Sequence, residues 1–198
     1  MTMDAGTIAF YDREAGTYGK WAEEFGLPDH FQHFARTLPK GAAVLDFGCG
    51  GGWAAKAFHA QGCKVTALDP SQGMIAEIAK TPGIDTICGQ AADIAPRRFD
   101  AIWAHFSLQH IPREDLPAVL DQLAAALTPS GRLFVGIHEG TKTHRDSLDR
   151  LYNHYTEPDL RGLLLAAGFT TDSLNRAKDK SYDGHPIEVM NLEAHKHA

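Results

Sequence analysis

Glycine and aspartate cluster in one short stretch of the chain, where they could hold a nucleotide-like ligand. The segment VLDFGCGGG covers residues 44–52 and places four glycines within five positions, with Asp46 two residues ahead of the first. Glycine-rich turns that follow a strand let the backbone approach a ligand closely. The loop therefore predicts a pyrophosphate cradle, a cradle for a nucleoside without phosphate, or a simple tight turn.

The spacing of these glycines agrees poorly with the dinucleotide fingerprint G-x-G-x-x-G. Counted from Gly48, the third glycine would fall at position 53, which is Trp53. Counted from Gly50, the pattern reads Gly50, Gly52 and Ala55, and alanine is an accepted variant at the third position. The acid ahead of the loop would repel a pyrophosphate and attract a ligand with ammonium and sulfonium groups. The loop therefore favours a cationic nucleoside without phosphate.

A second acid follows at a distance that suits a ribose. Asp69 lies 21 residues beyond Gly48, at the end of the strand expected over residues 64–69. A carboxylate there can accept hydrogen bonds from both ribose hydroxyls. This disfavours NADP, but NAD and S-adenosylmethionine both remain open.

The apolar pattern predicts the elements that must position these residues. We expect strands over 42–48, 64–69, 84–89, 99–106 and 131–138, and helices over 7–26, 28–38, 52–61, 72–80 and 156–168. A further helix should have Pro112 in its first turn and an apolar face from Leu116 to Leu127. Two more strands are expected in 169–196, around the turn YDGHP. Alternation of strands and helices predicts an α/β fold with a doubly wound, mostly parallel sheet. Ligands of such sheets bind beyond the carboxyl ends of the strands, where the glycines lie.

Composition limits the classes of partner. The 198 residues suit one domain, and a formal charge of −6 without a dense basic run argues against nucleic acid or an anionic membrane as partner. The three cysteines form no C-x-x-C pair, so neither a metal site nor a disulfide framework is expected. The first residues lack the features of a secretory signal, and no apolar run approaches the roughly 18 residues of a membrane span. We expect a cytoplasmic protein.

Together, the motifs resemble one family. The segments VLDFGCGGG, ALDPS, GQAADI, FDAIWAHFSLQHIP and LTPSGRLFVGIHEG are similar, in order and spacing over roughly residues 40–170, to the class I S-adenosylmethionine-dependent methyltransferases. The resemblance implies a Rossmann-like sheet of seven strands that ends in a C-terminal antiparallel hairpin. It also implies an N-terminal helical lid over residues 1–39, as in the small-molecule branch, and one compact cofactor-binding domain over 40–198.

The resemblance also implies which residues contact S-adenosylmethionine. They are Asp46, Gly48 and Gly50 at the methionine end, Asp69 at the ribose, Pro70, Met74, Ala92 and Asp93 around the adenine, His105 and Phe106 beside the methyl group, and Tyr11 and Tyr18 of the lid above it. Two residues depart from the family pattern. Trp53 begins a helix where many members have a smaller residue, and Gln109 precedes His110 where two successive histidines are common.

The acceptor is predicted less closely than the donor. The position after the fourth strand reads AHFS rather than an N-P-P-Y-type segment, which argues against methylation of adenine or glutamine nitrogens, and no Pro-Cys nucleophile is present for cytosine chemistry. A small molecule under the lid is favoured. If the acceptor must lose a proton, the candidate general bases are His105, His110, His138 and Glu139, with no reason in the sequence to choose among them. The atom methylated and the oligomeric state are not predicted.

Two other functions compete with methyl transfer. An NAD-dependent oxidoreductase would use the same fold and the same acid at the ribose. A non-catalytic S-adenosylmethionine-binding protein would keep Asp46, the glycines and Asp69 without turning over a substrate.

Overall fold

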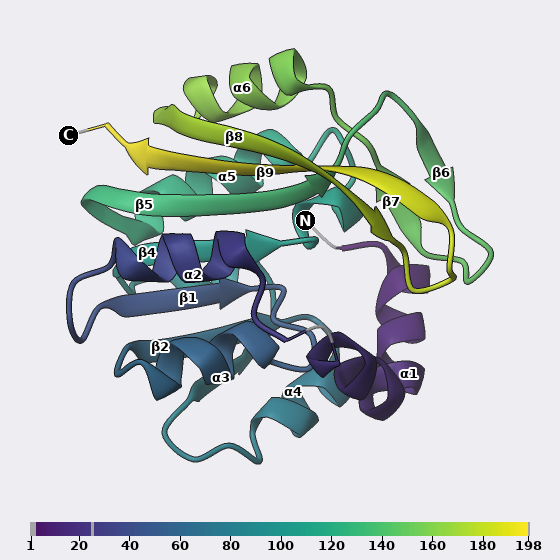
Figure 1. The fold of residues 1–198 in the computed structure, drawn as a ribbon, viewed down its shortest axis with the longest axis horizontal. Helices are drawn as coiled ribbons and strands as arrows, with labels where there is room; N and C mark the ends of the chain where they lie inside the picture. Colours follow the sequence, from purple (N-terminus) through teal and green to yellow (C-terminus); the bar gives the residue numbers. More distant parts are fainter. Residues whose placement is uncertain (1–2, 25, 198) are drawn as a thin grey trace.

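One mixed sheet organises the chain in the computed structural model, which describes residues 3–24 and 26–197. Within these residues seven strands form a sheet in the order β3-β2-β1-β4-β5-β9-β8 (Figure 1). The strands are β1 (Ala43–Phe47), β2 (Lys64–Asp69), β3 (Asp85–Cys88), β4 (Phe99–His105), β5 (Leu127–His138), β8 (Phe169–Lys180) and β9 (Pro186–Lys196). Neighbours from β3 to β5 pair in parallel, and β9 runs antiparallel to both β5 and β8. The predicted fold class is confirmed, including the C-terminal hairpin.

Helices cover both faces of this sheet (Figure 1). One face packs against α2 (Asp29–Arg36), α3 (Trp53–Ala60) and α4 (Gln72–Ile78), and the other against α5 (Leu116–Ala126) and α6 (Glu157–Ala166). β1 and β4 are buried almost throughout, because strands covered on both faces must be apolar on both. None of the described helices is long and apolar enough to cross a membrane.

The carboxyl ends of the parallel strands open toward a separate layer. It consists of α1 (Ala5–Glu23) and a two-stranded sheet of β6 (Thr143–Arg145) and β7 (Leu151–Asn153), which lie at this end in Figure 1. The glycine loop meets α1 at Gly19, and the 3-10 turn η2 (Leu108–His110) packs against β7, so both lie between the strands and this layer. The 3-10 turn η1 (Ala91–Ile94) follows β3 and packs against α5. The fold thus forms a site between the strand ends and α1, where sheets of this kind bind ligands.

Most predicted elements are present, with three local differences. β5 begins at Leu127 rather than at 131, and β6 and β7 were not predicted. Pro112 lies ahead of α5, whose first turn instead holds Pro117. The carbonyl of Pro112 accepts hydrogen bonds from the backbone amides of Asp115 and Leu116, so this proline shapes the turn that leads into the helix.

Helix α1 continues through Gly16 and Gly19 and is attached to the body at several points. Asp4 caps its first turn by accepting a hydrogen bond from the Thr7 amide, and it also forms an ion pair with Arg145 of β6 at 2.6 Å. Further along, Asp12 accepts hydrogen bonds from the Ser71 hydroxyl and the Gly73 amide at the start of α4. Hydrogen bonds therefore hold α1 across the strand ends.

Helix α2 differs from α1 in its environment. Phe31 and Phe34 are fully buried against the sheet and pack on Phe58 and Trp103. The boundary of the lid at residue 39 stays a prediction. Because α2 belongs to the core packing of the sheet, α1 alone has the position of a lid across the strand ends.

Candidate functional site

The glycine loop turns sharply at the end of β1 and folds back over β2. The backbone amides of Gly48 and Cys49 both donate to the carbonyl of Leu68. Gly48, Gly50 and Gly52 have φ of 73°, 51° and 79°, a conformation that favours glycine. At position 48 a Cβ atom would also lie 2.3 Å from the Cβ of Ser107, so glycine is required there for space as well.

Asp69 supports this loop from the end of β2. Its carboxylate accepts hydrogen bonds from the amides of Gly50 and Ser71, each at 2.9 Å. Burial raises the pKa of Asp69 to about 6, although both hydrogen bonds act in the opposite direction. Asp69 lines the larger cavity described below. It is therefore a buried carboxylate, held in place by backbone amides, that a ligand can still reach.

Asp46 lies beneath the loop rather than in a cavity. Its carboxylate accepts a hydrogen bond from the Ala55 amide in the first turn of α3 at 3.0 Å. The side chain is 3% exposed, and burial raises its pKa to about 7, with a smaller contribution from the charge of Asp69. Asp46 thus anchors α3 to β1. It lines neither cavity, so it would influence the methionine end of a cofactor through its charge rather than by direct contact.

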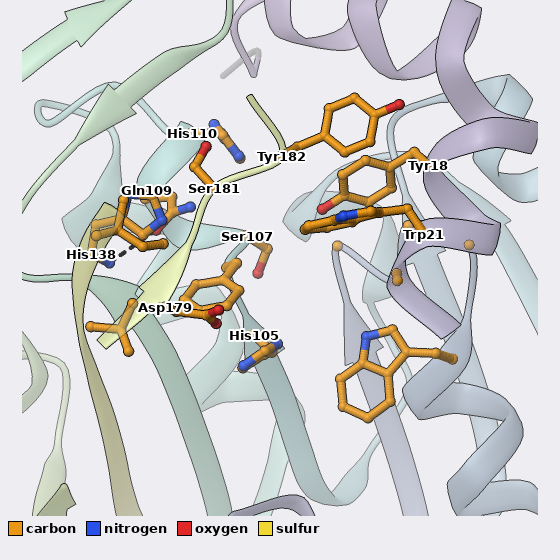
Figure 2. A pocket seen from close by; sticks show the side chains of 18 of the residues that line it. Tyr18, Trp21, His105, Ser107, Gln109, His110, His138, Asp179, Ser181 and Tyr182 are labelled. Carbon is orange, nitrogen blue, oxygen red and sulfur yellow. Dashed lines mark hydrogen bonds between the residues drawn. The ribbon is translucent and has the colours of Figure 1, made fainter. Parts of the chain in front are cut away.

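Two cavities meet at the loop. The larger, of about 300 Å³, lies between α1, the ends of β4 and β5, and the β8–β9 hairpin (Figure 2). The smaller, of about 240 Å³, lies between β1, β2, η1 and α5. Met3, Gly48 and Ser107 line both of them. An extended ligand could therefore pass over Gly48 from one cavity into the other.

The residues predicted around an adenine divide into two groups. Pro70 and Ala92 line the smaller cavity. Met74 is fully buried, and the carboxylate of Asp93 accepts a hydrogen bond from the Gln90 amide within η1. Neither of these two is among the residues lining either cavity, so the structure brings only the first pair to a ligand-accessible surface.

The chain turns abruptly into the cavities after β4. His105 is the last residue of the strand, and Phe106 follows with φ of 57°, a left-handed conformation that is strained for a large side chain. The turn places His105, Phe106 and Ser107 on the wall of the larger cavity, where a ligand could contact them. Burial lowers the pKa of His105 well below its ordinary value, so the ring is neutral near pH 7.

His110 lies on the same wall with both ring nitrogens engaged. Its Nδ1 is 2.6 Å from the carbonyl oxygen of Leu151, and its Nε2 is 3.2 Å from the Tyr11 hydroxyl. Because a carbonyl oxygen can only accept, Nδ1 carries the proton, and Nε2 accepts from Tyr11. Burial lowers the pKa of His110 to about 4, which keeps this arrangement neutral. Tyr11 and His110 therefore form a hydrogen-bonded pair between the lid and η2.

The last two candidate bases, His138 and Glu139, lie in different surroundings. His138 lines the larger cavity, stacks on Tyr152 at 5.0 Å between ring centroids, and has a pKa lowered to about 3 chiefly by burial. The carboxylate of Glu139 accepts two hydrogen bonds from Arg176 of β8 and lines neither cavity. Glu139 is thus occupied outside the site, whereas His138 lies within it.

Aromatic side chains form the wall opposite β4. Tyr18 and Trp21 of α1 lie beside Tyr182 from the tip of the β8–β9 hairpin (Figure 2). The ring of Tyr182 is 5.1 Å from each of the other two rings, measured between centroids. Near them, Gly19 passes so close to the glycine loop that a Cβ on Gly51 would be 2.6 Å from the Cα of Gly19. Tyr18 thus lies by the loop, and Trp21 and Tyr182 extend the same wall.

Sequence reasoning missed a buried cation in this site. Arg150 is 1% exposed, lines the larger cavity and forms an ion pair with Asp146 at 2.6 Å. Its guanidinium lies 4.8 Å from the ring centroid of Phe10 and 5.2 Å from that of Tyr152. A lone arginine in a polar loop gives no periodic or motif signal. Its role depends on the β6–β7 sheet, which was itself not predicted.

A family model described as "Methyltransferase domain" matches residues 18–174 of the chain. A curated relative, the ubiquinone biosynthesis O-methyltransferase of Xylella fastidiosa, is 36% identical over 120 residues, which cover 54% of this chain and 47% of the relative. The chain thus spans about half the length of the curated relatives it matches.

Solved structures share the fold at lower identity. The 1,6-didemethyltoxoflavin-N1-methyltransferase of Burkholderia thailandensis superposes with a TM-score of 0.80 at 22% identity, covering 98% of this chain and 88% of that one. The [4+2]-cyclase SpnF superposes with a TM-score of 0.71 at 19% identity, covering 85% and 80%. The second is named for a cyclisation, so the shared fold does not by itself fix the chemistry.

Proposed function

The chain belongs to the methyltransferase-domain family, and from that premise we propose that it transfers a methyl group from S-adenosylmethionine to a small-molecule acceptor. The observation that carries this proposal is the junction of the two cavities at Gly48 and Ser107, beside Asp69 and above Asp46. The relatives named for ubiquinone biosynthesis and for toxoflavin support a small acceptor.

The residues present fit this donor. Asp69 would accept from the ribose hydroxyls, Gly48 and Gly50 leave the backbone open toward the methionine half, and Pro70 and Ala92 would flank the adenine. Among the described residues that line the smaller cavity, the single charged side chain is acidic, Asp115. This surrounding suits a phosphate-free ligand better than a dinucleotide, because a pyrophosphate would meet acids without a nearby cation.

When bound, S-adenosylmethionine supplies a methyl group already activated on sulfonium. The protein must then align the acceptor and exclude water. The three aromatic rings of Tyr18, Trp21 and Tyr182 would help to exclude water, because they pack on one another and line the larger cavity. We therefore propose that α1 acts as a lid and that the strand ends hold the donor.

His110 is our choice of general base for acceptors that must lose a proton. Its Nε2 is unprotonated and accepts a hydrogen bond from the hydroxyl of Tyr11, and Tyr11 lines the larger cavity. Tyr11 would take the acceptor's proton while passing its own to His110 Nε2, which leaves an imidazolium that still donates to Leu151. Glu139 lacks such a route, because Arg176 occupies its carboxylate.

Turnover tests the proposed function. We expect S-adenosylhomocysteine to accumulate when the full chain and S-adenosylmethionine are incubated with a panel of phenolic and heteroaromatic acceptors. The control is the same incubation without acceptor. A protein that binds the donor but gives no product above this control across the panel would support the non-catalytic alternative.

The pH dependence of turnover tests the base. With a pKa of about 4, His110 is unprotonated above that pH, so wild-type kcat should stay level from about pH 6 to 8 and fall only in more acidic solution. His110→Gln should lower kcat by about 100-fold while changing KM little. A His138→Gln variant that loses more turnover than His110→Gln would show that the assignment is wrong.

A further inference from the structure

The floor of the larger cavity contains a row of residues across three strands. His105 of β4 pairs with Gly136 of β5, and Gly136 pairs with Asn191 of β9, so the three lie side by side in the sheet. A Cβ on Gly136 would be 2.4 Å from the His105 ring and 3.2 Å from Asn191 Oδ1. The missing side chain at Gly136 thus leaves the space in which the imidazole and the amide meet.

Three polar atoms around this floor have no partner. Asn191 Oδ1, His30 Nε2 and Ser107 Oγ are buried and have no hydrogen bond among the described residues. Asn191 and Ser107 are each 6% exposed, and all three residues line the larger cavity. A buried polar atom left unpaired destabilises the folded protein, so such atoms in a cavity wall indicate a ligand that completes them.

Flat rings surround these atoms. The ring of His30 lies 5.2 Å from that of His105 and stacks on Phe134 at 5.4 Å. Trp53 lies edge-on to His105 at 5.8 Å, and Phe106 is 4.1 Å from His105. Aromatic walls at these distances favour a planar aromatic ligand, by stacking and edge-to-face contacts.

The charges nearby argue against an anionic ligand. The acids that act on His30 are Asp29 and Asp179, and Asp179 also lines the cavity. Two cations line the cavity: buried Arg150, whose guanidinium is paired with Asp146 although its Nη2 has no hydrogen bond among the described residues, and Lys180, which is exposed. An anion on the floor would therefore face the unpaired Asn191 Oδ1 and the carboxylate of Asp179, whereas the buried cation of the cavity already has a counter-ion.

We propose that this floor is the acceptor subsite and that it takes a planar, uncharged aromatic molecule whose O–H or N–H group donates a hydrogen bond to Asn191 Oδ1. The proposal rests on the proposed function, since it places the acceptor beside the predicted site of the methyl donor, and it adds the acceptor's chemistry. Asn191 is then the residue that selects and orients the acceptor.

Calorimetry with simple probes tests this subsite. Catechol is planar and uncharged and carries two donors, 1,2-dimethoxybenzene keeps the ring without a donor, and benzoate is a planar anion. Each is titrated into the full chain saturated with S-adenosylhomocysteine. We expect measurable binding of catechol, and binding at least about tenfold weaker for the other two, because a site built to pair with a donor rejects analogues that lack it.

Two variants of similar chemistry provide the comparison. Asn191→Leu removes the buried amide, and Asn175→Leu makes the same change at a residue of β8 that pairs with Asn191 in the same row. Asn191→Leu should weaken catechol binding about tenfold and leave 1,2-dimethoxybenzene unchanged. Asn175→Leu should change neither. Because the amide oxygen is unpaired in the free protein, Asn191→Leu should melt no lower than wild type.

The outcomes separate the subsite from the proposed function. Unchanged catechol binding by Asn191→Leu, tighter binding of benzoate than of catechol, or no catechol binding by wild type would overturn the subsite. A lower melting temperature for Asn191→Leu would do so as well, because it would show that the amide has a structural partner. Binding of S-adenosylhomocysteine, measured in a separate titration of each protein before the probes are added, reports on the proposed function alone.

Discussion

Replacement of Asp46 by asparagine should stabilise the ligand-free protein, increasingly so as pH rises. The asparagine side chain would keep an oxygen for the Ala55 amide and remove a carboxylate that is 3% exposed. Folding raises the pKa of Asp46 from 3.8 to about 7. Between these values the folded chain holds more protons than the unfolded chain, so the free energy of unfolding falls as pH rises through this range.

The size of the effect follows from the shift. About three pKa units correspond to about 4 kcal/mol when the carboxyl is fully ionised, of which about 2–3 kcal/mol develops between pH 5 and pH 8. Urea unfolding of wild type and Asp46→Asn at both pH values measures it. The advantage of the variant should grow by that amount, whereas Asp121→Asn, at an exposed position on α5, should show no such growth.

A constant difference between Asp46→Asn and wild type at the two pH values would refute this reasoning. It would mean that the carboxyl titrates alike in the folded and unfolded chains, and that burial under the glycine loop does not govern it. The gain in stability should coincide with weaker binding of S-adenosylmethionine, because the variant lacks the negative charge beneath the predicted methionine end.

Two further substitutions test the packing of the site. Gly48→Ala should lower the free energy of unfolding by about 3 kcal/mol or more, because its Cβ would overlap Ser107. The control Gly41→Ala, at φ of 75° and with no atom near its Cβ, should lower the free energy of unfolding by only about 1–2 kcal/mol, from left-handed strain alone. Equal losses in urea unfolding would contradict the overlap. Arg150→Met should cost about 3–5 kcal/mol, because it leaves the buried Asp146 carboxylate without a cation and, among the described residues, with only the Leu148 and Arg150 amides as partners. Arg161→Met, in a partly exposed pair with Glu157, should cost less than about 1 kcal/mol. Similar melting of these two variants would show that burial of the Arg150 pair is energetically unimportant.

The sequence predicts the sheet and the loop well because both depend on local signals. Short apolar runs and helix periodicity mark the strands and helices, and glycines with acids at fixed distances mark the strand ends that face the ligand. The positions of Gly48, Gly50 and Asp69 on the larger cavity follow from that pattern.

Other parts of the site depend on contacts between distant segments. Asn191 acquires its place from pairing with Gly136, and Tyr182 from a hairpin that folds back onto α1. Arg150 enters the site through the short β6–β7 sheet, whose strands of three residues are too brief to leave a pattern. Such positions follow from tertiary structure, and a single sequence carries no local trace of them.

Binding of the donor decides whether the strand ends hold S-adenosylmethionine. S-adenosylmethionine and NAD are titrated calorimetrically into wild type and into Asp69→Ala, with melting curves to confirm that the variant is folded. We predict that wild type binds S-adenosylmethionine and not NAD, and that Asp69→Ala binds it at least about tenfold more weakly, because charge-assisted hydrogen bonds of about 1.5–3 kcal/mol are lost. Binding of NAD in preference to S-adenosylmethionine, or unchanged affinity in a folded Asp69→Ala, would show that this site does not hold the donor as proposed.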